Sequence, residues 1–232
     1  VLLGLSMALV LMLKRRPIVN KSKPKGNWQD LTLGLSYVWG HKPVLGARAL
    51  DLVAVLLGGV TALLPIFATD ILGVGSTGYG WLRAAPALGA VLMALLIAQK
   101  PLRRRMGQAM FIGVGLYGLA TLIFALSSNF WLSITMLIIA GAADMISVFV
   151  RQNLVQVATP DAMRGRVGAV NSVFITASNE LGEFESGAVA ALIGVVPCVV
   201  VGALGTLTVT LFWSRLFPAL RAYDRPQDPI NA

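Results

Sequence analysis

The chain has 232 residues, of which 56% are hydrophobic and 12% are charged, and its mean hydropathy is +0.77. A soluble domain carries about twice that share of charged residues, so this composition excludes an ordinary water-soluble fold. The net charge of +9 does not indicate nucleic-acid binding, because Lys and Arg lie in short blocks between long uncharged stretches. The single cysteine, Cys198, excludes a disulfide framework within the chain and any multi-cysteine metal site.

Residues 1–13 form an apolar run of 13 residues, shorter than the roughly 20 residues that span a bilayer. The basic block from Lys14 to Arg16 follows this run, whereas in a signal peptide the basic residues come first. We therefore expect residues 1–13 to be the end of a transmembrane helix whose start, with an N-terminal region of the same protein, precedes Val1.

Residues 14–46 are predicted to form a basic cytoplasmic loop. A lysine-rich linker at 20–26 is followed by Leu31, Leu35, Val38 and Trp39 at helical spacing. This pattern predicts a short helix that lies on the membrane surface and serves as an anchor.

Six apolar segments of about the length of a membrane span follow the loop. They cover residues 47–69, 81–99, 108–126, 132–150, 169–194 and 198–214. The predicted fold class is therefore an all-α membrane protein with six full transmembrane helices plus the end of a seventh. Residues 47–217 form the predicted bundle, and residues 218–232 form a cytoplasmic tail.

The connectors alternate between basic and non-basic. Positive charge gathers at 14–42, 100–105, 151–166 and in the tail, whereas 70–80, 127–131 and the turn near Pro197 have none. Basic connectors of membrane proteins face the cytoplasm, and of the 19 Lys and Arg residues only Arg83 falls on the other side. The sequence thus predicts a multi-pass protein of a bacterial-type plasma (inner) membrane with a cytoplasmic C-terminus.

Motifs for cofactors or catalysis give no support for an enzyme. Residues 73–78 and 113–118 both match G-x-G-x-x-G, but the first is expected between two spans and the second inside one. The only histidine, His41, has no Cys or His neighbour, and no hydrolase or zinc motif is present. We expect no enzyme activity, no cofactor and no metal.

Ionisable residues inside the spans are few, and each costs roughly 2.5 to 3.5 kcal/mol near the bilayer centre. They are Asp51, Arg83, Asp144, Glu180, Glu183 and Glu185, with Arg48 and Arg151 close to cytoplasmic ends. A structural ion pair between Arg48 and Asp51, one helical turn apart, is as well supported as a functional role for them. Arg83 is expected to snorkel to the outer interface.

The segment 169–194 is predicted to be a helix with a polar side and an apolar side. Its polar stripe includes Thr176, Asn179, Glu180 and Glu183, and two carboxylates three residues apart in a poorly solvated place favour proton uptake. The predicted proton-coupling or substrate-path residues are Glu180, Glu183, Asn179, Thr176, Asp144, Asp51 and Arg151. The alternative is that both glutamates have a structural role only and accept hydrogen bonds from donors on neighbouring helices.

The stretch 158–171 reads A-T-P-D-A-M-R-G-R-V-G-A-V-N, with R-Q-N-L-V-Q before it at 151–156 and S-N-E-L-G-E-F-E-S-G after it at 178–187. This region resembles a cytoplasmic loop and the following helix of major facilitator superfamily exporters, similar to enterobactin exporters and macrolide efflux proteins. The resemblance extends over nearly the whole chain, as the C-terminal half of a twelve-helix fold. One departure is residues 99–107, which read Q-K-P-L-R-R-R-M-G and lack the acidic residue of the family's G-x-x-x-D-R-x-G-R loop motif.

The resemblance implies a secondary transporter that exports a small amphipathic molecule, of the drug or siderophore class, by alternating access in exchange for protons. Its implied partners are the substrate, protons, the lipid bilayer and the N-terminal half of the same protein. The alternatives from other classes are a non-transporting membrane scaffold or assembly component, an intramembrane enzyme, which lacks a nucleophile and base here, and a primary pump with its P-loop on a separate subunit.

Overall fold

The computed structural model describes residues 42–102, 104–159, 164–221 and 223–224, and every regular element in these ranges is helical. The predicted surface helix, His41 and residues 1–13 lie outside them. The elements are α3 (Lys42–Leu57), α4 (Val60–Ile66), the π-helical turn η1 (Phe67–Ile71), α5 (Gly75–Gln99), α6 (Met106–Leu126), α7 (Phe130–Ala158), α8 (Arg164–Ile193), α9 (Val195–Leu216) and α10 (Pro218–Arg221).

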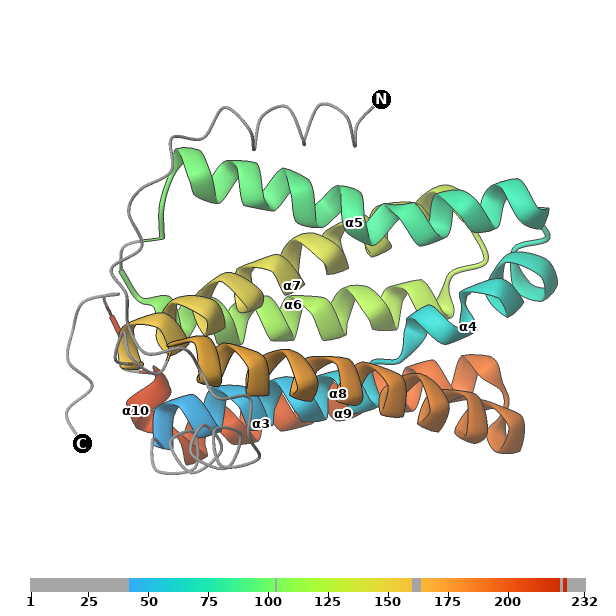
Figure 1. Cartoon of the computed structure of the whole chain (residues 1–232). Helices are drawn as coiled ribbons and strands as arrows, with labels where there is room; N and C mark the ends of the chain where they lie inside the picture. The colour runs from blue at the N-terminus through green and yellow to red at the C-terminus, as the bar shows by residue number, and fades with distance from the viewer. Residues whose placement is uncertain (1–41, 103, 160–163, 222, 225–232) are drawn as a thin grey trace.

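The long helices lie roughly side by side in three layers (Figure 1). Helix α5 forms one outer layer, α6 and α7 form the middle, and α3, α8 and α9 form the other outer layer. Helix α7 packs on both α5 and α6, α6 packs on α9, and α3 packs on α8 and α9. The loop between α5 and α6, the C-terminal end of α7 and α10 meet at one end of the bundle, which we call the basic end because Lys100, Arg104, Arg105 and Arg221 lie there.

Among the residues that the structure describes, five segments are long and apolar enough to cross a membrane: Leu45–Ile71, Gly75–Gln99, Met106–Leu126, Phe130–Val157 and Val195–Leu216. The predicted segment 169–194 is a single helix, α8, but it is not among the five. Its three glutamates and its polar stripe lower its hydropathy, so the predicted count of six spans is not confirmed by length and composition.

The predicted boundaries of the connector 151–166 are wrong at both ends. Helix α7 continues through Arg151 to Ala158, and α8 already begins at Arg164. The sequence 151–158 has no helix breaker, and its apolar residues Leu154 and Val155 are buried in the core, which keeps it helical. As a result Arg151 is a buried residue of a helix and not a loop residue.

The first predicted span is also interrupted, between α3 and α4. The backbone N–H of Gly58 bonds the carbonyl of Val55 at 3.2 Å, and that of Val60 bonds the carbonyl of Gly58 at 2.6 Å. These contacts run three and two residues back, so the regular four-residue pattern of the α-helix stops here. Pro65, which has no N–H to donate, lies inside α4, and the π-helical turn η1 follows directly after α4.

Small residues let α5 and α7 cross closely. A Cβ atom added to Gly141 of α7 would overlap the backbone of Pro86 in α5, and one added to Gly89 of α5 would overlap the backbone of Ile138 in α7. Such contacts between small residues are the usual way in which helices associate within a membrane, where lipid is as apolar as leucine. They fix α7, and with it Asp144, against α5.

The chain after α9 docks on the start of α6. The side chain of Leu220 is fully buried, the N–H of Gly107 donates to the carbonyl of Tyr223 at 2.9 Å, and the N–H of Arg105 donates to Oδ1 of Asp224 at 2.6 Å. Arg105 has φ +54°, a left-handed conformation that turns its N–H toward Asp224. An acidic residue is therefore present at this loop, but it comes from the segment after α10.

Labelling of single cysteines tests the direction of α5. In a Cys198→Ala background, cysteines at Ser76 and Gln99, both exposed and at opposite ends of α5, should react with a membrane-impermeant reagent from opposite faces of the membrane. We expect Ser76→Cys to react only from outside, since the basic end is predicted to be cytoplasmic. Reaction of both positions from the same face would contradict the topology.

Candidate functional site

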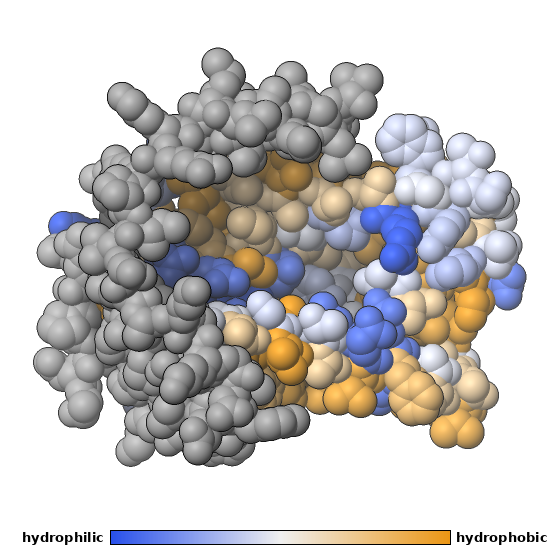
Figure 2. All heavy atoms as spheres, viewed as in Figure 1, coloured by the Kyte–Doolittle hydropathy of each residue, from blue (hydrophilic) through white to orange (hydrophobic). Residues whose placement is uncertain are grey.

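A cavity of about 390 Å³ lies in the middle of the bundle. Two hydrophobic clusters flank it: one at the basic end includes Leu50, Met110 and Leu154, and the other includes Phe67 and Phe124. Along α6 and α7 most cavity residues fall between the two clusters, and Val114 and Leu137 belong both to the cavity wall and to a cluster. Figure 2 shows polar side chains gathered in a hollow between α5 on one side and α8 on the other. The cavity, which we call the chamber, therefore lies between two apolar clusters, and its largely apolar wall carries the carboxylates Asp51, Asp144 and Glu183.

The guanidinium group of Arg151 is shared by two carboxylates. Its Nη1 forms an ion pair with Oδ1 of Asp51, and its Nη2 lies 3.8 Å from Oδ1 of Asp144. Its Nε donates to the carbonyl of Ser147 at 3.3 Å. The side chains of Arg151 and Asp51 are 7% and 17% exposed, whereas that of Asp144 is 54% exposed toward the cavity that it lines. We call Asp51, Asp144 and Arg151 the charge triad.

The triad runs from the middle of the bundle toward the basic end. Asp144 is the central residue of α7, and Arg151 lies seven residues further, about 10 Å along the helix axis. Asp51 lies seven residues before Gly58, which is close to the middle of its span. Because α3 and α7 run in opposite directions, both displacements point to the same end. The triad therefore links the cavity to the basic end.

The helix break brings backbone polar groups to the cavity. The hydroxyl of Tyr117 in α6 donates to the carbonyl of Gly58 at 3.0 Å, and both residues line the cavity together with Gly59. A Cβ atom on Gly58 would lie 3.0 Å from the Tyr117 hydroxyl, so glycine leaves room for this contact. Tyr117 was missed by the sequence analysis, although a tyrosine and Thr121 one turn apart in an otherwise apolar span were a usable signal.

Only part of the predicted polar stripe of α8 lines the cavity. Asn179 and Glu183 line it, whereas Thr176 and Glu180 are exposed and are not among its lining residues. Three carboxylates line the cavity: Asp51, Asp144 and Glu183. Among the described residues, no lysine or arginine lines it. Of the seven residues predicted from sequence, four line this cavity, namely Asp51, Asp144, Asn179 and Glu183. A fifth, Arg151, does not line it but contacts Asp51 and Asp144.

The buried side of α8 was not predicted. It is a row of small residues four apart, Ser178, Gly182, Ser186 and Ala190, all of which are buried. A Cβ atom on Gly182 would lie 2.8 Å from the carbonyl of Val55, so the backbones of α8 and α3 are in close contact. The spacing of small residues was the signal, since it is the same pattern that brings membrane helices together.

The other charged residues of the spans do not join this cavity. Arg83 is exposed, and its guanidinium lies 3.5 Å from the hydroxyl of Tyr79, one turn away on α5. Glu185 is exposed on α8 and does not line the cavity. Asp51 pairs with Arg151, and the side chain of Arg48, the partner considered from sequence, lies outside the described residues.

Within the described residues, four of the five membrane-length segments line this cavity together with α8, and the cavity wall carries three carboxylates. This arrangement is that of a multi-pass membrane protein of the transporter class. A family described as transmembrane secretion effectors, within the major facilitator superfamily, matches residues 8–231, and the chain belongs to this family. No curated protein and no solved structure matches the chain closely enough for comparison.

Proposed function

We propose that this chain is the C-terminal half of a proton-driven exporter that moves a small amphipathic molecule, of the drug or siderophore class, by alternating access. It acts in a bacterial-type inner membrane with its basic end and its C-terminus in the cytoplasm, and an N-terminal half of the same protein completes the pathway. The resemblance to enterobactin exporters and macrolide efflux proteins supports the direction and the substrate class.

The observation that carries the proposal is the sharing of one guanidinium by two carboxylates beside a cavity at half the depth of the bundle. With Asp51 and Asp144 both ionised, the triad has a net charge of −1. A proton on Asp144 leaves a neutral pair of Arg151 and Asp51, and a neutral pair costs less free energy within a membrane-spanning bundle than a net charge. Glu183, across the chamber on α8, is a second carboxylate that can take a proton or contact a substrate.

The experiment is transport by the full-length protein in inverted membrane vesicles, with a panel of dyes, macrolides and catecholate siderophores. An acidic vesicle interior should drive uptake of at least one member, and a protonophore should abolish that uptake. Vesicles without the protein give the background. Uptake that persists unchanged after collapse of the proton gradient would contradict proton coupling, and no uptake of any member would favour the membrane scaffold.

A further inference from the structure

A groove of about 740 Å³ on the outside of the bundle lies between α6, α9 and α10. Its walls are apolar, with Phe111 and Ile112 from the start of α6 and Leu211 and Phe212 from the end of α9. Ile112, Leu211 and Phe212 are 68%, 71% and 61% exposed. No helix of the described chain covers these side chains, and none of the residues that line the groove lines the central cavity.

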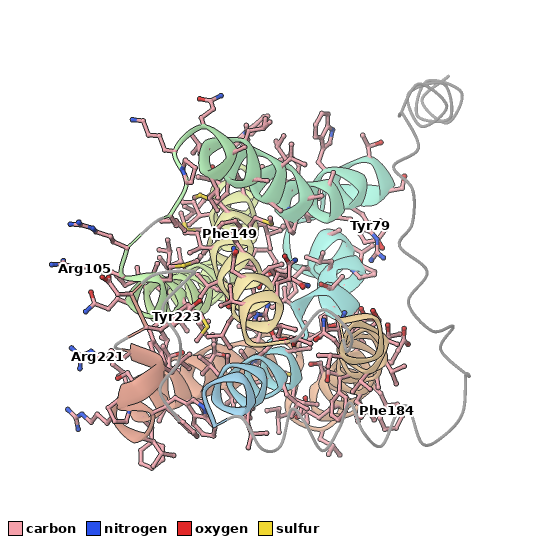
Figure 3. The ribbon with its side chains drawn as sticks, turned by 60° about the vertical axis from the view of Figure 1, so that its left-hand side comes forward. Tyr79, Arg105, Phe149, Phe184, Arg221 and Tyr223 are labelled. Carbon is pink, nitrogen blue, oxygen red and sulfur yellow. The ribbon has the colours of Figure 1, made fainter. Side chains whose placement is uncertain are left out.

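Two arginines stand at the rim of this groove. Arg215 lies in the last turn of α9, and Arg221 is the last residue of α10. Neither forms an ion pair with a described residue, since the ion pairs found there both involve Arg151. In Figure 3 Arg105 and Arg221 project from the same side of the molecule, away from the helices.

The position of Arg221 is fixed by the fold. Leu220, next to it, is fully buried against the core at the basic end, and the bonds from Arg105 and Gly107 to the residues after α10 hold this segment on α6. The backbone at Arg221 is therefore held in place before a ligand binds, so little backbone freedom remains to be lost on binding.

We propose that the groove is a binding site for an anionic phospholipid. Its charge and its apolar walls match the two parts of such a lipid: the arginines meet the phosphate, which a guanidinium binds through two parallel N–H groups, and the acyl chains lie along the exposed apolar residues. Basic pockets between transmembrane helices at the cytoplasmic side are suited to such headgroups. The arginines lie at the end of the helices, where the headgroups of a surrounding bilayer are found.

The test is binding of phosphatidylglycerol to the purified full-length protein, measured by native mass spectrometry. Phosphatidylcholine with the same acyl chains is the neutral comparison, and inorganic phosphate is the free anion. Removal of each arginine should weaken phosphatidylglycerol binding about fivefold, so Arg215→Gln with Arg221→Gln should weaken it about thirtyfold. Arg104 lies at the same end but does not line the groove, so Arg104→Gln should have little effect on phosphatidylglycerol binding.

Replacement by lysine at both positions keeps the charge but loses the two parallel N–H groups, so it should bind more tightly than the glutamine variants and more weakly than the wild type. If the double glutamine variant does not fold, Arg221→Gln alone carries the test. Equal binding of the two lipids, displacement of the lipid by inorganic phosphate, or unchanged binding by the glutamine variants would overturn the proposal. Because the readout is binding, the result does not depend on the proposed transport activity.

Discussion

Replacing Arg151 with glutamine should destabilise the protein and abolish transport driven by a proton gradient. The change leaves Asp51, which is 17% exposed, without its counter-ion inside the bundle. Loss of one partner from a buried ion pair costs about 3 to 5 kcal/mol, because the remaining charge is left unpaired. The measurements are thermal unfolding of the purified full-length protein and uptake by inverted vesicles.

Two further variants show whether the effect comes from charge pairing. Asp51→Asn combined with Arg151→Gln removes both charges and should recover much of the lost stability, but not transport. Arg104 is an exposed residue of the loop before α6, so Arg104→Gln should leave stability and transport close to wild type. Wild-type stability in the Arg151→Gln variant would show that the pair with Asp51 is not formed in the membrane.

Replacing Glu183 with glutamine should reduce gradient-driven efflux to the background of vesicles without the protein. Glutamine keeps the shape of the side chain and most of its hydrogen bonding, but it cannot ionise. Glu183 lines the cavity, so the change removes a charge that faces the transported proton or substrate. The variant should still insert and fold, because the side chain is exposed and no described hydrogen bond depends on it.

Glu180→Gln is the matched comparison, since the two glutamates lie on the same helix and differ in that only Glu183 lines the cavity. We expect a smaller loss of efflux from Glu180→Gln than from Glu183→Gln. Unchanged efflux in the variant that carries both substitutions would remove these residues from the mechanism. Equal losses from the two single variants would place Glu180 in the pathway as well, as the helical stripe alone predicts.

The apolar segments and the charges within them could be identified from sequence because each has a direct physical cause. Runs of apolar residues give membrane-length helices, and the cost of a charge within a span draws attention to its few ionisable residues, Asp51, Asp144 and Glu183 among them. Arg151 was also among the predicted site residues, but the residues that it pairs with could not be identified in this way. Arg151 was assigned to a connector because arginine marks cytoplasmic loops, whereas the pairing with Asp51 depends on how α3 and α7 cross.

The small-residue row on α8 and the break at Gly58 and Gly59 were missed for a related reason. Ser178 and Gly182 carry little weight in a hydropathy pattern, although they decide which side of the helix packs. Two adjacent glycines in an apolar run do not by themselves end a helix. The break becomes evident only when the hydrogen bonds are followed through it, and the Tyr117 contact is visible only once α6 lies beside it.

The interrupted helix has a mechanical consequence. In an unbroken α-helix, bending one half against the other stretches backbone hydrogen bonds on the outer side of the bend. Between α3 and α4 the regular bonds are already replaced by shorter-range ones, and the carbonyl of Gly58 has a side-chain donor in Tyr117. A change in the angle between the two segments therefore breaks no further regular helical bond. The break thus separates α3, which carries Asp51, from α4, which carries Thr61 of the cavity wall, so the regular helical bonds do not hold these two wall residues at a fixed distance.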